Sequence, residues 1–291
     1  MGQSRIPVDL CSPGQVFACM GLLEAADVLC GGAEGWFDWH GEPCFQLSSE
    51  KEDFPLSMIF DFLIDAKVCA VAPGKWKPEK ECEGDVIYRP TFPDKEPNEM
   101  ALPILMRGKG IEVVLGHWAD GSSRDNFKLY AGNRTAHAIA VSMIHGVKKK
   151  GTKGMDQIYA DDRNGVIDNP FSSLCDVGGS FNFDPRGGWT SIDVGFSPND
   201  LKAKGSKARV LSSPIVEIMA AWGLEHARPK AVEQRLYRYS VWNEPIPPSL
   251  ARAVVGCGVP STSLLQRRFY FPLAMSGKNK VIVHATEETE K

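Results

Sequence analysis

The amino-acid sequence predicts an α+β protein with mixed or antiparallel sheets and packed helices. Three observations support this prediction. Residues 12–32 and 212–229 read as long apolar helices that both begin with Ser-Pro. Residues 233–245 and 267–285 alternate aromatic and polar side chains, as β-strands do. Apolar residues make up 43 % of the 291 residues, which is enough to bury a substantial core.

The N-terminal elements follow from caps, turns and periodicity. Ser12 is the expected N-cap of the helix at residues 12–32, and a Gly-Gly pair is expected to end it. Residues 35–48 predict a hairpin, because aromatic strand residues flank a His-Gly-Glu-Pro turn. Residues 54–71 read as one amphipathic helix, and residues 111–120 as a buried strand.

The middle of the sequence is less regular. Residues 72–103 are rich in proline and are expected to be irregular connections. Residues 125–150 read as a strand end, a glycine turn and a helix. Residues 148–170 lose periodicity and gain glycine and charge, so we expect a long loop or an inserted arm. Two short strands are predicted at residues 178–198, followed by a basic loop at residues 199–212.

The C-terminal helix at residues 212–229 has Ser212 or Ser213 as its expected cap. A short helix at residues 247–258 and a closing hairpin at residues 267–285 follow. Both Ser-Pro helices run on to Gly-Leu, Glu and Ala with one residue of slippage, and each precedes an aromatic strand. This echo indicates either a duplicated helix–strand unit or two similarly capped helices, and the sequence leaves both interpretations open.

Charge is divided unevenly along the chain. Residues 1–140 hold 13 Lys and Arg against 21 Asp and Glu, whereas residues 141–291 hold 20 against 15, so balances of −8 and +5 give the net charge of −3. A basic half suits a polyanionic partner, although scattered solvated charges give the same count. We expect an acidic α+β region at 1–147, a basic flexible arm or loop at 148–170 and a basic α+β region at 171–291, or one continuous domain.

Cysteine usage and hydropathy predict a cytoplasmic protein without a membrane span. The eight cysteines form no C-x-x-C pair, which argues against a zinc site, and free thiols are the simplest interpretation. No apolar run reaches the roughly 20 residues of a membrane helix. No basic stretch followed by an apolar segment marks a secretory signal at the start of the sequence. We also expect no metal and no cofactor.

Basic residues gather in three regions and predict contacts with nucleic-acid phosphates. Aromatic residues lie nearby in two strands, and bases stack on such side chains. The start of the helix after Gly132 adds an expected anion site, with Asn133 as N-cap and Arg134 beside the free amides. The predicted nucleic-acid-binding residues are Lys128, Asn133, Arg134, Lys148, Lys149, Lys150, Lys153, Lys202, Lys204, Lys207, Arg209, Arg267 and Arg268. The alternative is solvated lysines with core-facing aromatics.

Catalytic motifs are weak in this sequence. It contains no P-loop, no G-x-G-x-x-G and no G-x-S-x-G elbow. His137 and His145 are eight residues apart on one helix, too far to share a metal. The stretch GHWADGSSRDN offers His117 with nearby aspartates and serines, so a stand-alone hydrolase remains an alternative. We predict no catalytic residues and a protein that is not an enzyme.

Several blocks of sequence resemble one known family. The stretch IPVDLCSPGQVFACMGLLEAADVLCGGAEGWF (6–37) resembles the N-terminal signature of the Csb-three (Dpsyc-subtype) family of type I-U CRISPR-associated proteins. FKLYAGNRTAHAIAVSM (127–143) is similar to that family's central K-x-[WY]-A-G turn and helix. SPIVEIMAAWGLEHARP (213–229) and YRYSVWNEPIPPSLARAV (237–254) resemble its C-terminal block. The blocks occur in the family's order and span most of the chain.

The resemblance implies a subunit of a type I RNA-guided surveillance (Cascade) complex in antiviral defence. As a large-subunit-like component, it would contact the flank of the target DNA (the PAM) and recruit a helicase-nuclease. Its implied partners are CRISPR RNA, target DNA and the other Cascade subunits. The chain is short for a large subunit, so a backbone-type (RAMP-like) subunit that binds CRISPR RNA is the alternative. That alternative would contain ferredoxin-like (RRM-like) units.

Overall fold

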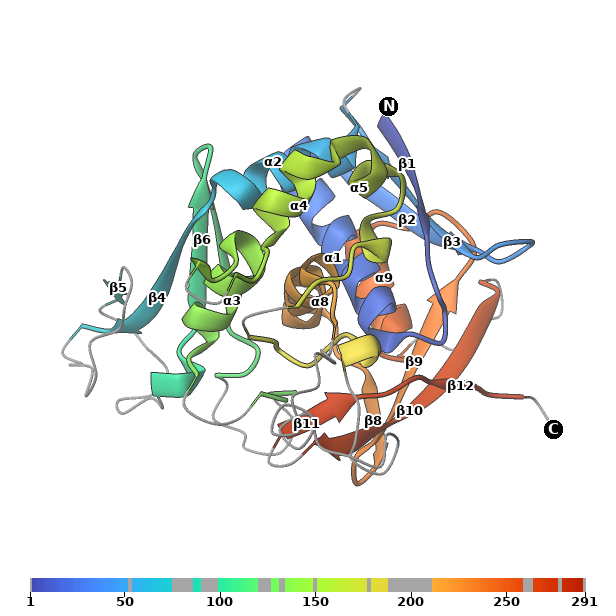
Figure 1. Cartoon of the computed structure of the whole chain (residues 1–291). Helices are drawn as coiled ribbons and strands as arrows, with labels where there is room; N and C mark the ends of the chain where they lie inside the picture. Colours follow the sequence, from blue (N-terminus) through green and yellow to red (C-terminus); the bar gives the residue numbers. More distant parts are fainter. Residues whose placement is uncertain are drawn as a thin grey trace.

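Two long helices that begin with Ser-Pro cross at the centre of the protein. The computed structural model describes residues 2–51, 54–74, 86–89, 99–119, 127–130, 134–148, 151–176, 179–187, 211–258, 264–276 and 279–289. The helices α1 (Pro13–Cys30) and α8 (Pro214–His226) pack against each other, and Figure 1 shows them surrounded by the sheets and the other helices. Nearly every residue of both helices is buried, as expected of helices covered on all sides.

Two glycines allow the backbones of α1 and α8 to touch. A Cβ atom on Gly21 would overlap the carbonyl oxygen of Met219 and lie 3.0 Å from the amide nitrogen of Gly223. A Cβ atom on Gly223 would overlap the carbonyl oxygen of Phe17. Glycine at the crossing is therefore required by the close approach of two backbones.

The first sheet has the strand order β1-β3-β2, with both pairings antiparallel. It contains β1 (Gly2–Pro7), β2 (Ala33–Asp38) and β3 (Cys44–Ser49), so the predicted hairpin is confirmed. The chain order β1-α1-β2-β3-α2, with β3 between β1 and β2, is the split β-α-β arrangement that opens a ferredoxin-like unit. The arrangement is incomplete, because the next strand joins a different sheet.

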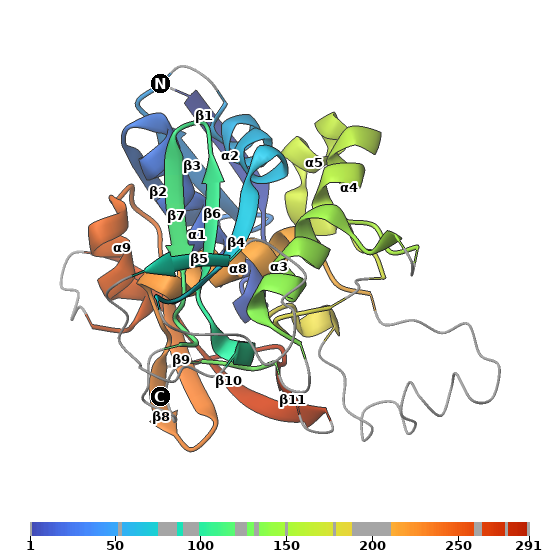
Figure 2. The same ribbon diagram turned by 90° about the vertical axis from the view of Figure 1, so that its left-hand side faces the viewer.

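The second sheet corrects the prediction of one helix at residues 54–71. Helix α2 (Pro55–Asp65) ends at Ala66, and β4 (Lys67–Pro73) follows directly. The order is β5-β4-β6-β7, with β4 parallel to β5 and the other pairs antiparallel. The remaining elements are β5 (Val86–Arg89), the 3-10 helix η1 (Glu99–Ala101), β6 (Ile104–Gly108) and β7 (Ile111–Leu115). Figure 2 faces this sheet and shows β7 at its edge, where its residues alternate between buried and exposed instead of being continuously buried.

Residues 151–172 form short helices instead of the expected loop or arm. Helix α3 (Ala136–His145) leads into α4 (Met155–Asp161), α5 (Arg163–Asp168) and the 3-10 helix η3 (Pro170–Ser172). Met155, Tyr159 and Val166 are buried in the main core, and they hold α4 and α5 against the rest of the protein. These three residues and the half-buried Ile158 and Ile167 alternate with glycine and charged residues, which obscures the helical pattern in the sequence.

The third sheet is built by the C-terminal part of the chain, as predicted. It contains β8 (Lys230–Glu233), β9 (Leu236–Trp242), β10 (Gln266–Ser276), β11 (Asn279–Ile282) and β12 (Thr286–Glu287). The order is β11-β10-β9-β8, and β12 also pairs with β10. Helix α9 (Pro248–Val255) packs on β9, which confirms the predicted short helix. The closing hairpin is formed by β10 and β11.

The sequence echo has a counterpart in the topology. Each Ser-Pro helix is followed by an antiparallel strand pair and then a helix, as α1-β2-β3-α2 and as α8-β8-β9-α9. In each unit the second strand also pairs with a further antiparallel strand, β1 beside β3 and β10 beside β9, although β1 precedes its unit in the chain and β10 follows its unit. This repeated arrangement favours a duplicated unit over two similarly capped helices.

Residues 179–187 contain no strand, in contrast to part of the prediction for residues 178–198. The amides of Phe181 and Phe183 donate to the carboxylate of Glu217, so they cannot form a strand ladder. The segment ends in the 3-10 helix η4 (Pro185–Gly187). The rest of the predicted strand pair lies outside the described residues.

A single main core runs through the three regions expected from charge. Its buried residues extend from Ile6 to Ala285 and include residues of α1, α3, α4, α8 and β10. The architecture is α+β with mixed and antiparallel sheets, as the sequence predicts. Helix α1 has the length and apolar composition of a membrane span, but 89 % of it is buried inside the fold, where it serves as the central core helix.

Candidate functional site

Seven of the predicted nucleic-acid-binding residues lie outside the described part of the chain. They are Asn133, Lys149, Lys150, Lys202, Lys204, Lys207 and Arg209. The helix beside Asn133 is described, and its N-cap is Thr135, whose Oγ1 accepts from the amide of Ala138 at 3.1 Å. The prediction that Asn133 caps this helix is therefore wrong, because the helix begins at Ala136.

The described basic residues do not form one patch. Arg134 and Lys148 are exposed and flank opposite ends of α3, whose ten residues span about 15 Å. The Lys128 ammonium donates to the carbonyl oxygen of Tyr130 at 3.1 Å and lies 4.2 Å from the Tyr130 ring. Burial, followed by repulsion from Lys280, lowers the pKa of Lys128. Lys153 is exposed and pairs with Asp161 at 2.6 Å.

A groove of about 550 Å³ opens beside Arg267, at the N-terminal end of α1. The end of β1, the start of α1, η3, η4 and the start of β10 each contribute to its walls. Its lining residues are Pro7, Val8, Asp9, Leu10, Cys11, Gln15, Pro43, Asn169, Phe171, Ser172, Arg186, Arg267 and Phe269. The lining combines apolar surface with amides, a carboxylate and two guanidinium groups, as small-molecule sites do.

Arg267 is fixed by Glu287 but retains hydrogen-bond donors. Its Nε and Nη2 donate to the two carboxylate oxygens of Glu287 at 2.6 and 2.5 Å. The guanidinium also lies 5.7 Å from the Trp39 ring and 5.5 Å from the Phe269 ring. The hydrogen bonding of Arg267 to the Glu287 carboxylate raises the pKa of Arg267. Within the described residues Nη1 makes no hydrogen bond, so this edge of the fork can donate to a ligand. Arg268, the next residue, is exposed.

Arg186 also lines the groove and is held by internal partners. Its Nε and Nη2 donate to Asp184 at 2.9 and 2.8 Å, and its Nη1 donates to the carbonyl oxygen of Phe171 at 2.7 Å. Asp184 is fully buried and also accepts from the amide of Ser213 at 2.8 Å. Arg186 therefore ties η4 to η3 and to the start of α8, and its charge is balanced inside the protein.

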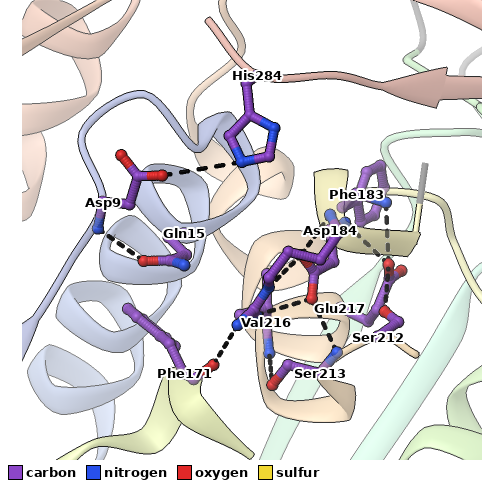
Figure 3. Close-up of polar contacts among 11 residues, drawn as sticks. Asp9, Gln15, Phe171, Phe183, Asp184, Ser212, Ser213, Val216, Glu217 and His284 are labelled. Carbon is purple, nitrogen blue, oxygen red and sulfur yellow. Dashed lines mark hydrogen bonds and ion pairs between the residues drawn. The ribbon is translucent and has the colours of Figure 1, made fainter. Parts of the chain in front are cut away.

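The floor of the groove carries an amide whose acceptor is used internally. Gln15 is 8 % exposed, and its Oε1 accepts from the amide of Asp9 at 2.8 Å. Asp9 in turn accepts from the amide of Cys11 at 2.9 Å, and its other oxygen lies 3.8 Å from His284 Nε2. Figure 3 shows Asp9 between Gln15 and His284. The Nε2 donors of Gln15 make no hydrogen bond among the described residues.

Glu217 holds the segment behind the groove. It is fully buried at the start of α8 and accepts from the amides of Phe181, Phe183 and Asp184 at 2.8, 3.1 and 2.9 Å. Ser212 also donates to it at 3.3 Å, and Figure 3 shows Phe183, Asp184 and Ser212 around Glu217. Burial outweighs these hydrogen bonds and raises the pKa of Glu217 to about 7. The cluster is structural, because it has no access to solvent.

The placement of His117 does not suit the hydrolase alternative. The residue is 2 % exposed, and its ring packs 4.7 Å from Trp118 and 5.9 Å from Phe183. Its backbone amide donates to Glu225 at 2.7 Å. A general base must reach substrate, so this burial counts against catalysis through His117. The aspartates and serines that follow Ala119 in this stretch lie outside the described residues.

Comparison of the chain with protein-family models, with curated proteins and with solved structures gives no match.

Sequence reasoning identified Arg267 but missed the rest of the groove. Gln15 resembles an ordinary first-turn helix residue, and Arg186 resembles a loop residue before Gly-Gly. Asn169 lies in the segment at residues 148–170 that was expected to be a loop or arm, and Phe171 and Ser172 directly follow it. One signal in the sequence could have indicated the groove. Gln15 is a polar residue on the first turn of an otherwise apolar core helix, and a buried glutamine requires a hydrogen-bonding partner.

Proposed function

We propose that this protein is a non-catalytic, nucleic-acid-binding subunit of a type I CRISPR RNA-guided surveillance complex. The resemblance of four sequence blocks to the Csb-three (Dpsyc-subtype) family supports the choice of complex. Those blocks supply α1, α3, α8, β9 and α9, and these elements pack around one core. The resemblance therefore concerns the framework of the molecule.

The observation that carries nucleic-acid binding is the free edge of Arg267. A guanidinium that lies near two aromatic rings and is fixed by Glu287 is preorganised to donate to a phosphate or base oxygen. Arg268 follows it on β10, where successive side chains point to opposite faces of the sheet, so exposed Arg268, Arg134 and Lys148 supply further positive charge elsewhere on the surface. Such contacts give affinity that falls with rising salt.

The finer role rests on the resemblance alone. As a large-subunit-like component, the protein would contribute to target DNA binding and PAM recognition and would recruit the helicase-nuclease in the cytoplasm. The split β-α-β arrangement of β1, α1, β2 and β3 favours the second candidate, a backbone-type subunit that binds CRISPR RNA, because this arrangement opens an RRM-like unit.

The proposal is tested by purifying the tagged protein from its native host under conditions that express its gene neighbours. We expect a discrete RNA of uniform length and several proteins in fixed ratio. One copy of this chain per RNA identifies the large-subunit role, and several copies identify the backbone role. A monomer that carries no nucleic acid overturns both.

A further inference from the structure

The groove beside Arg267 has the size and the hydrogen-bonding groups of a ligand site. Its volume of about 550 Å³ lies within the range of about 300–1,000 Å³ that holds small molecules. Its walls come from five separate elements; Arg186 links η4 to η3, Asp184 links the start of η4 to the start of α8, and Gln15 links α1 to the segment after β1. A cavity whose walls are cross-linked in this way is formed before any ligand arrives.

The polar groups in the groove select the chemistry of the ligand. Gln15 presents Nε2 donors, and Asn169 presents a second side-chain amide on the lining. Side-chain amides and guanidinium edges are the groups that hydrogen-bond to the edges of nucleobases. Val8, Pro43 and Phe171 supply apolar surface for the flat face of a base.

Charge limits how much phosphate the ligand brings. Arg186 is balanced by Asp184, Arg267 is balanced by Glu287, and Asp9 adds one carboxylate at the rim. Among the described residues that line the groove, each guanidinium is therefore matched by a carboxylate. A polyphosphate would be repelled, whereas a base with one backbone phosphate at Arg267 Nη1 is accommodated.

From these observations we infer that the groove binds one unpaired nucleotide of a single-stranded RNA, with the base between Gln15 and Asn169 and its phosphate at Arg267. This inference rests on the proposed function for the identity of the strand. It adds a specific pocket to the dispersed basic surface predicted from the sequence.

Photo-crosslinking tests the inference directly. The probe is a ten-nucleotide single-stranded RNA containing 4-thiouridine, irradiated with the purified chain and followed by peptide mass spectrometry. We expect crosslinks in the peptides that contain residues 8–15 or 169–172. RNA that binds but crosslinks only to other peptides overturns the inference.

Variants provide the second measurement. Ser172→Trp fills the groove from an exposed position, and Gln15→Glu keeps the oxygen that accepts from Asp9 while removing the Nε2 donors. We expect groove crosslinks to fall at least about tenfold in both, consistent with the loss of one base contact. Arg163→Ala is the matched control, because it removes an exposed arginine on α5 that pairs with Asp61 outside the groove. Equal crosslinking in all variants overturns the inference.

The groove and the proposed function fail separately. Suppose that the host complex carries RNA but 4-thiouridine does not crosslink to the groove peptides, or that a partner protein covers those peptides and slows their hydrogen exchange. Either result refutes nucleotide binding in the groove and retains the proposed function. A chain that binds uridine 5′-monophosphate in a manner lost in Ser172→Trp, yet forms no complex in the host, retains the groove and refutes the function.

Discussion

The crossing of α1 and α8 makes Gly21 the most sensitive position that the structure reveals. Gly21→Ala places a methyl group onto the Met219 carbonyl, with the Met219 carbon 2.8 Å away and the amide nitrogen of Gly223 3.0 Å away. These are backbone atoms of a buried helix, so no side chain can rotate to make room. The two helices must separate by about 1.5 Å to bring the methyl group and the Met219 carbonyl oxygen to an ordinary contact distance.

The cost of that separation can be estimated from packing. A gap of about 0.5–1 Å forfeits roughly a quarter to a half of each van der Waals contact that it opens. Overpacking one methyl group in a core costs about 1–3 kcal/mol where side chains can adjust. Because the clash is with backbone, we expect a loss of about 3–5 kcal/mol, even after the gain of about 1 kcal/mol in helix propensity from Gly to Ala.

Urea unfolding followed by circular dichroism measures this loss, and thermal unfolding should show a fall of roughly 10 °C in Tm. Gly41→Ala is the control, because nothing lies within 4 Å of a Cβ atom there. Gly21→Ala combined with Gly223→Ala should cost less than the sum of the single changes, since the first opens the crossing for the second. If the unfolding free energy of Gly21→Ala is within about 1 kcal/mol of that of the native chain, the close backbone contact at this crossing does not limit stability and the prediction is wrong.

Two further predictions concern charge. Burial raises the pKa of Glu217 from 4.5 to about 7, so the folded state favours the protonated form. The contribution of Glu217 to stability should therefore be complete below pH 4.5 and fall by about 3 kcal/mol as pH rises to 7. In Glu217→Gln, the difference in unfolding free energy between pH 5 and pH 7.5, measured by urea titration, should be smaller than in the native chain. An unchanged difference contradicts the raised pKa of Glu217. Replacing Lys148, Lys149 and Lys150 with Glu should weaken RNA or DNA binding and lower the slope of log K against log salt by about 0.7–0.9 per lost contact; Arg163→Glu is the control, and unchanged affinity removes these lysines from the contact surface.

The sequence predicted the elements whose local signals agree with their burial. Ser213 caps α8 by accepting from the amide of Val216 at 3.3 Å, and Gly31 ends α1 in the left-handed conformation. Ser12 occupies the N-cap of α1, as predicted. Its side chain makes no capping hydrogen bond, so the position was predicted correctly but the expected contact does not form. Position in a sequence pattern fixes backbone geometry more reliably than it fixes side-chain partners.

Other elements were missed because their signals are shared by several structures. An apolar run such as VCAVAP has no period that separates a buried strand from a helix, so the boundary at Ala66 was lost. The alternation of Phe181 and Phe183 in the sequence resembles a strand. In the structure their backbone amides donate to the carboxylate of Glu217, which is 34 residues from Phe183, and not to a neighbouring strand. Such long-range partners are invisible to a reading of neighbouring residues.

The groove was unpredictable for the same reason, and its position depends on the central crossing. Its floor comes from the first turn of α1 through Gln15, and its far wall is fixed to the first turn of α8 through Asp184 and Ser213. The backbone of Phe183 lies directly against Gly14, which joins the two helix starts. The distance between Gln15 and Arg186 is thus set by how closely α1 and α8 approach at Gly21 and Gly223. The same two glycines that permit the core to close therefore fix the width of the proposed nucleotide site.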